Sequence, residues 1–149
     1  MRHVLEREQV VPRPRPEVFA FFADAANLER LTPASLRFRI KSPLPIAMRP
    51  GAVIEYDLSL LGVRFGWRTL IERFEPPERF VDVQARGPYR SWRHTHEFEE
   101  VPGGTRIVDR VEYELPFGPL GGLAHRLFVA RQLRAIFDYR RRVIAEIFG

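Results

Sequence analysis

Residues 90–115 read RSWRHTHEFEEVPGGTRIVDRVEYEL. Apolar and aromatic side chains take every second position on either side of Pro102-Gly103-Gly104. A period of two is typical of a half-buried β-strand, and a short proline- and glycine-containing connector is typical of a hairpin. The stretch therefore predicts two antiparallel neighbours with one shared inner face. The side chains predicted on that face are Trp92, His94, His96, Phe98, Ile107, Asp109, Val111 and Tyr113.

Asp109 is the one acidic side chain on this inner face. An unpaired buried carboxylate costs several kcal/mol, so we expect a histidine partner. Asp109 should lie within one residue pair of His96, although a bulge at the glycine-rich turn would change which residues face each other, so the partner is either His94 or His96. Such a group either anchors a ligand carbonyl or hydroxyl, with Tyr56 and Tyr113 adding hydroxyls, or forms a buried network that only specifies the core.

The period of two continues upstream of the hairpin. It predicts strands at residues 52–60, 63–74 and 79–86, which are separated by Gly62, Pro76-Pro77 and Gly87-Pro88. Connectors this short join antiparallel neighbours, so the strands should form a meander. Another strand, at residues 4–11, ends at the proline-rich residues 12–16.

Helical periods occupy the two remaining parts of the chain. Two short helices are predicted between Pro16 and Pro33, separated near residues 24–27. A helix of about thirty residues, about 45 Å long, is predicted from the glycine-rich residues 117–122 to the end. Its apolar stripe is Leu123, Leu127, Ala130, Leu133, Phe137, Ile144 and Phe148. The predicted fold is α+β, a single domain over residues 1–149, in which a curved antiparallel sheet of six to seven strands wraps around the long C-terminal helix.

Charge and composition narrow the function classes. The 149 residues carry 24 Lys and Arg against 19 Asp and Glu, a formal charge of +5 that is spread along the chain. We therefore expect no specific nucleic-acid binding, although residues 140–142, three consecutive arginines, leave a polyanion or protein-partner surface as one hypothesis. The chain has no cysteine, no apolar run of transmembrane length and no signal-peptide pattern at its start, so we expect a cytoplasmic location.

Several blocks, in this order, resemble the START-related superfamily, also called SRPBCC. They are Val11-Pro12-x-Pro14-x-x-x-Val18-Phe19-x-Phe21-Phe22, Glu75-Pro76-Pro77-Glu78-Arg79-Phe80, Gly87-Pro88-Tyr89-Arg90-x-Trp92-x-His94-x-His96-x-Phe98, Gly104-Thr105 and Asp109-x-Val111-x-Tyr113-x-Leu115-Pro116. The superfamily includes polyketide cyclase- and dehydratase-like and coenzyme Q-binding proteins, and the later blocks are most similar to an uncharacterised ligand-binding branch. The resemblance covers nearly the whole chain. It implies a helix-grip fold with a cavity between sheet and helix for a lipid, quinone or polyketide-like molecule.

The leading hypothesis is therefore a protein that binds or carries a hydrophobic small molecule. The predicted ligand-binding side chains are Tyr56, Trp67, Ile71, Trp92, His94, His96, Phe98, Asp109, Val111, Tyr113, Leu127 and Phe137. The alternative is a cyclase- or dehydratase-type enzyme that uses His94, His96 and Asp109 for acid–base chemistry. These three side chains also allow a metal site, but no fourth ligand is evident, so no metal is predicted. No dinucleotide or phosphate-loop motif is present, and no cofactor is predicted. The sequence leaves the oligomeric state open.

Overall fold

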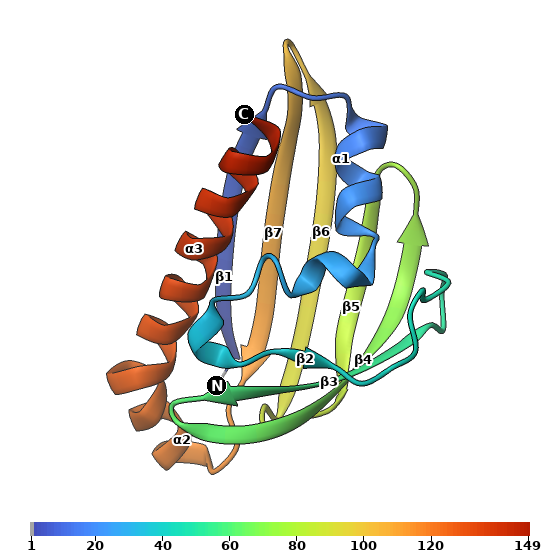
Figure 1. Cartoon of the computed structure of the whole chain (residues 1–149). Helices are drawn as coiled ribbons and strands as arrows, with labels where there is room; N and C mark the ends of the chain where they lie inside the picture. The colour runs from blue at the N-terminus through green and yellow to red at the C-terminus, as the bar shows by residue number, and fades with distance from the viewer. Residues whose placement is uncertain (1) are drawn as a thin grey trace.

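The computed structural model describes residues 2–149 and contains one curved, unclosed antiparallel sheet of seven strands. The strand order is β1-β7-β6-β5-β4-β3-β2, which confirms the predicted meander. The strands are β1 (Arg2–Val11), β2 (Arg39–Ile40), β3 (Val53–Leu60), β4 (Val63–Glu75), β5 (Arg79–Arg86), β6 (Ser91–Val101) and β7 (Gly104–Glu114). Figure 1 shows the long C-terminal helix running beside β1 and across the concave side of this sheet.

The β6–β7 hairpin keeps one register from Ser91↔Glu114 to Val101↔Gly104, so Pro102 and Gly103 form a two-residue turn. No bulge interrupts it, which settles the register that the sequence left open. A Cβ at Gly104 would lie 1.9 Å from the carbonyl oxygen of Val11. Glycine is therefore required where the end of β1 meets the start of β7.

The sheet bends between β4 and β5. Their register shifts between Arg68 and Thr69 and again between Ile71 and Arg73. Extra residues of this kind bend a strand and increase its twist. As a result β3 and β4 turn away from the direction of β6 and β7 and close one end of the concave face (Figure 1).

The segment after β1 contains one α-helix, α1 (Arg15–Phe22), and two 3₁₀ helices, η1 (Ala25–Leu28) and η2 (Ala34–Leu36). Helix α1 has proline in its first turn and buries Val18, Phe19 and Phe22. The second predicted helix is thus the 3₁₀ helix η1, which begins within residues 24–27, where a break between the two helices was predicted. At its start the Asp24 side chain accepts a hydrogen bond from the Ala26 amide. Helix α1 and the 3₁₀ segment lie over the concave face of the sheet (Figure 1).

The C-terminal helix is continuous from residue 118 but changes its winding. It comprises α2 (Gly118–Ala124), a π-helical turn η3 (His125–Val129) and α3 (Ala130–Phe148). A π turn takes more residues than an α turn, so the residues before it are rotated out of phase with those after it. The predicted apolar stripe is therefore wrong at its start: Leu123 and Leu127 are exposed, whereas Leu133 and Phe137 are buried.

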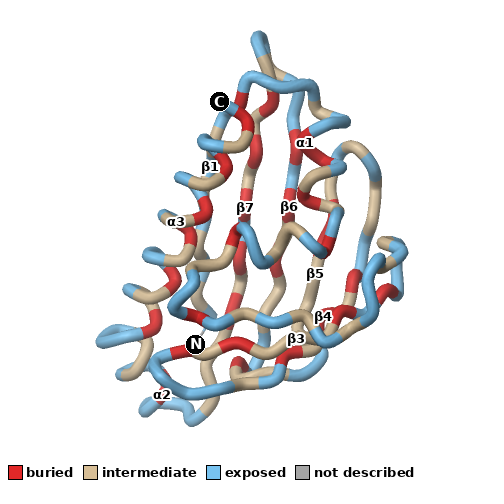
Figure 2. Tube along the Cα trace, viewed as in Figure 1, coloured by how far each residue is buried: buried red, intermediate tan, exposed pale blue. Residues whose placement is uncertain are grey.

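Burial alternates along the central strands and follows one side of α3, as Figure 2 shows. One cluster of buried apolar side chains packs α1 and the end of α3 against β5–β7, with Phe19, Phe80 and Phe98 at its centre. A second cluster lies toward the turn of β3 and β4, around Trp67 and Phe137. Within residues 2–149, no helix combines the length and apolar character needed to cross a membrane.

Candidate functional site

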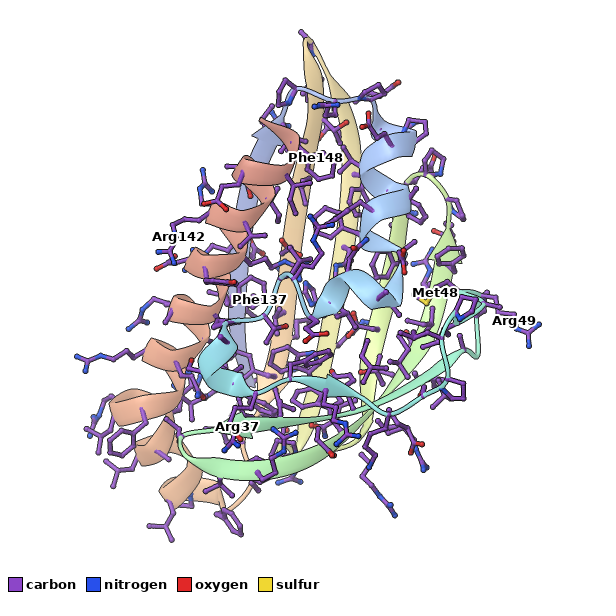
Figure 3. The ribbon with its side chains drawn as sticks, viewed as in Figure 1. Arg37, Met48, Arg49, Phe137, Arg142 and Phe148 are labelled. Carbon is purple, nitrogen blue, oxygen red and sulfur yellow. The ribbon has the colours of Figure 1, made fainter. Side chains whose placement is uncertain are left out.

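A cavity of about 160 Å³ lies between the concave face of the sheet, α3 and the segment from Phe22 to Phe38. Most of its lining is apolar or aromatic. The sheet contributes Ile54, Tyr56, Leu58, Leu60, Trp67, Thr69, Ile71, Phe80, Asp82, Trp92, His94 and His96. The helix α3 contributes Leu133, Ile136, Phe137 and Arg140, and Figure 3 shows Phe137 directed from this helix toward the sheet while Arg142 is directed away. An apolar enclosure with a few polar groups is typical of a small-molecule site.

The structure brings many of the predicted ligand-binding side chains together. Those that line the cavity are Tyr56, Trp67, Ile71, Trp92, His94, His96 and Phe137. Trp92 packs edge-on against Trp67 with ring centroids 5.3 Å apart, and both rings line the cavity. The Nε1 of Trp67 is buried and has no hydrogen-bond partner among residues 2–149.

The other predicted ligand-binding side chains lie outside the cavity lining. Phe98 is in the core against Phe19 and Phe22, and Val111 is fully buried. The hydroxyl of Tyr113 lies 2.7 Å from Nε2 of His125. Leu127 is 51% exposed because the π turn rotates it outward. Asp109 lies behind the histidines and reaches the cavity only through its partners.

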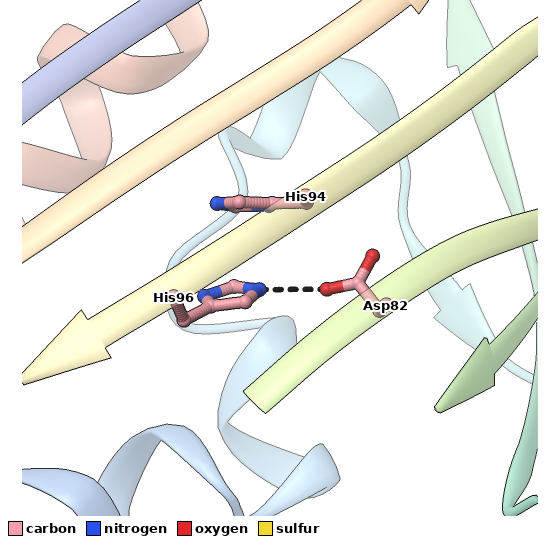
Figure 4. Close-up of side chains that lie close together, drawn as sticks. All are labelled: Asp82, His94 and His96. Carbon is pink, nitrogen blue, oxygen red and sulfur yellow. Dashed lines mark hydrogen bonds and ion pairs between the residues drawn. The ribbon is translucent and has the colours of Figure 1, made fainter. Parts of the chain in front are cut away.

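Two histidine–carboxylate pairs lie side by side on the sheet, one buried and the other partly buried. Nε2 of His94 donates to Oδ1 of Asp109 at 2.8 Å, and Nε2 of His96 donates to Oδ2 of Asp82 at 2.6 Å. His96 and Asp109 are directly opposite in the register, as predicted, yet the hydrogen bond of Asp109 goes to His94, and Nδ1 of His96 lies 3.6 Å from the same Oδ1. Figure 4 shows the two imidazole rings stacked, with a centroid separation of 3.6 Å.

The environment shifts the pKa of each of three groups downward. Burial and the neighbouring His94 lower the pKa of His96 to about 4, although Asp82 and Asp109 act to raise it. Burial acts to raise the pKa of Asp109, but the charge of Arg140 and the hydrogen bond from His94 outweigh it and hold that pKa well below its usual range. Burial also acts to raise the pKa of Asp82, but the hydrogen bond from His96 and nearby positive charge outweigh it, and the net shift of the pKa is downward. At neutral pH, His96 is therefore neutral and both carboxyl groups are ionised.

Sequence reasoning missed two members of this site, Asp82 and Arg140. Asp82 interrupts the apolar residues Phe80, Val81 and Val83, and that interruption is the available signal. The hypothesis that Arg140, Arg141 and Arg142 form one exposed surface is wrong for Arg140, which is only 9% exposed. The stripe of α3 buries Leu133, Phe137, Ile144 and Phe148, and position 140 is in phase with it. Arg141 and Arg142 are out of phase and remain exposed.

A metal ion fits this cluster poorly. Asp82, His94 and His96 bring their ligand atoms within 4.8 Å of one another. The two imidazole rings, however, stack with 24° between their planes, so their lone pairs lie in two nearly parallel planes and are poorly placed to share one ion. Both Nε2 atoms already face a carboxylate. The arrangement is better suited to proton transfer or hydrogen bonding with an organic molecule.

The comparisons with known proteins agree with the fold. Residues 2–143 match the family described as "Polyketide cyclase / dehydrase and lipid transport". The structure is similar to TTHA0849 from Thermus thermophilus, with a TM-score of 0.77 and 18% identity over 97% of this chain and 95% of that one. It is also similar to CV1439 from Chromobacterium violaceum, with a TM-score of 0.75 and 13% identity over 98% and 97%.

A third similar structure is the major latex-like protein 151 of Panax ginseng, with a TM-score of 0.67 and 11% identity over 99% of this chain and 97% of that one. Among curated proteins, no relative matches this chain in sequence. At these identities the structural neighbours establish the fold alone, whereas the family match spans nearly all of the chain. The chain therefore belongs to the polyketide cyclase/dehydrase and lipid transport family, of SRPBCC type.

Proposed function

We propose that this protein binds or carries a hydrophobic small molecule in the cavity between the sheet and α3. The observation that carries the proposal is the cavity of about 160 Å³ with its aromatic lining. An apolar cavity of about 150 Å³ in another protein stays dry and binds benzene, so this space suits a compact ring system. Quinone and polyketide-like rings fit that description better than an extended lipid chain.

Filling the cavity tests this proposal. The substitution Leu133→Trp adds an indole to a side chain of α3 that lines the cavity. We expect the amount of small molecule that copurifies with the protein, measured by mass spectrometry of an organic extract, to fall by about tenfold. Overpacking of this kind costs about 1–3 kcal/mol of folding free energy, so circular dichroism should still show a folded protein.

The substitution Leu127→Trp is the matched control. It places the same indole six residues earlier in the same helix, on an exposed position outside the cavity lining. Its extract should match that of the unmodified protein. If both variants retained the same copurified molecule, or if the unmodified protein were repeatedly empty, the cavity would not be the binding site.

A second candidate function is acid–base catalysis of the cyclase or dehydratase type. The observation that favours it is the two His–Asp couples whose imidazoles line the cavity, because a neutral His96 has Nδ1 unprotonated while Asp82 holds its Nε2 proton. With a poly-β-ketone substrate, His96→Gln should lower turnover by about 10²-fold or more. Asp109→Asn should also lower turnover, because Asp109 is the hydrogen-bond acceptor that orients His94. Turnover that is the same in both variants as in the unmodified protein would remove this candidate.

A further inference from the structure

Arg140 is a buried cation with two hydrogen-bond donors that have no acceptor among the described residues. Its side chain is 10% exposed and lines the cavity, and its Nε and Nη2 have no hydrogen-bond partner among residues 2–149. The nearest carboxylate oxygen, Oδ1 of Asp109, lies 3.6 Å from Nη2, which is an ion-pair contact without a hydrogen bond. Buried guanidinium donors left without acceptors are costly. An acceptor brought by a ligand would remove that cost.

The surroundings of the guanidinium are aromatic. Its Cζ lies 5.1 Å from the ring centroid of Phe22 and 5.8 Å from that of Phe137, and both rings also line the cavity. Both rings attract the guanidinium through cation–π contacts but offer it no oxygen. On the sheet, the Nε1 of Trp67 is a second buried donor without a partner among the described residues. An oxygenated ring compound thus fits the cavity better than a plain hydrocarbon.

The charges around Arg140 decide what kind of oxygen is favoured. Asp82 and Asp109 carry one negative charge each at neutral pH, because the pKa of each is lowered, while the low pKa of His96 keeps that imidazole neutral. The single guanidinium is already matched by Asp109. An anionic headgroup would add a buried negative charge with no cation of its own.

We propose that the ligand presents a neutral carbonyl oxygen to Arg140 and that the cavity discriminates against a carboxylate of the same shape. The inference rests on the proposed binding function and names the chemical class of its ligand. Arg140 is then the polar anchor of the site, and the aromatic walls hold the remainder of the molecule.

Three single-ring compounds of nearly equal shape test it: acetophenone, its hydrocarbon isostere α-methylstyrene, and benzoate. Affinities are measured at neutral pH by titration of amide and indole signals in ¹H–¹⁵N NMR spectra, which also report whether each variant is folded. For the unmodified protein we expect acetophenone to bind about tenfold more tightly than either other compound, the effect of one hydrogen bond to a charged donor. In Arg140→Met, acetophenone should bind only as well as α-methylstyrene, whose own affinity should be unchanged.

Arg142→Met is the matched control, because Arg142 is exposed on the same helix and does not line the cavity. It should keep the preference for acetophenone. If Arg140→Met alone does not fold, because Asp109 loses its counter-charge, the double variant Arg140→Met/Asp109→Asn removes both charges and should show the same loss of preference.

The outcomes separate this inference from the function on which it rests. Equal binding of acetophenone and α-methylstyrene by the unmodified protein would overturn the role of Arg140 and leave the binding function standing. Tightest binding of benzoate, or a preference for the ketone that survives in Arg140→Met, would overturn it as well. Failure of all three compounds to bind, together with an empty organic extract, would overturn both.

Discussion

Replacing Phe98 by alanine should lower the free energy of unfolding by about 3–5 kcal/mol, the usual cost of removing a fully buried aromatic ring. Phe98 is 3% exposed, and its ring centroid lies 5.3 Å from that of Phe19 and 5.5 Å from that of Phe22. The ring therefore ties α1 to β6. Because a domain of this size is stable by about 5–15 kcal/mol, the loss is a large fraction of the total. Urea denaturation followed by circular dichroism measures it.

A milder substitution at Phe98 distinguishes a role in core packing from a role in ligand binding. Phe98 lies outside the cavity lining, so Phe98→Leu, a milder change that keeps the protein folded, should leave the copurified ligand unchanged. Ile71→Val is the matched comparison within the lining, where a small change should alter the amount of bound ligand. A Phe98→Leu protein that folds normally but loses its ligand would show that this ring acts in binding.

Acid should destabilise the protein through His96. Its pKa is about 4 in the folded state, against about 6.5 in an unfolded chain. The folded state therefore disfavours the protonated imidazole, so the stabilising contribution is complete above about pH 6.5 and is lost as the pH falls toward 4. The difference between the two pKa values corresponds to about 3 kcal/mol. The lowered pKa of Asp109 acts in the same direction but below this window.

The measurement is the free energy of unfolding in urea at intervals from pH 8 to pH 4. In His96→Gln, the decline over this window should be smaller by about 3 kcal/mol than in the unmodified protein. His3 and His125, whose pKa values burial also lowers, contribute equally to both proteins. Glu97→Gln changes an exposed neighbour on the same strand and should leave the profile unaltered. Parallel profiles for His96→Gln and the unmodified protein would contradict the prediction.

The alternation of residues 90–115 was sufficient to predict the β6–β7 hairpin, its inner face and the approach of Asp109 to His96, all of which the structure confirms. The meander and the long final helix followed in the same way. Each of these features depends on side-chain period and on turn residues, which are local properties of a sequence. The family resemblance added the cavity between sheet and helix, which no local pattern specifies.

Only the tertiary structure decided which side chains become partners in the site and how the C-terminal helix is rotated against the sheet. The pairing of β5 with β6 places Asp82 opposite His94, and its carboxylate reaches diagonally to His96. The π turn at His125–Val129 rotates Leu127 to the surface. Arg140 is held beside Asp109 by the packing of α3 against the sheet. Contacts between residues far apart in sequence depend on how whole elements dock, and the chemistry of this site is built from such contacts.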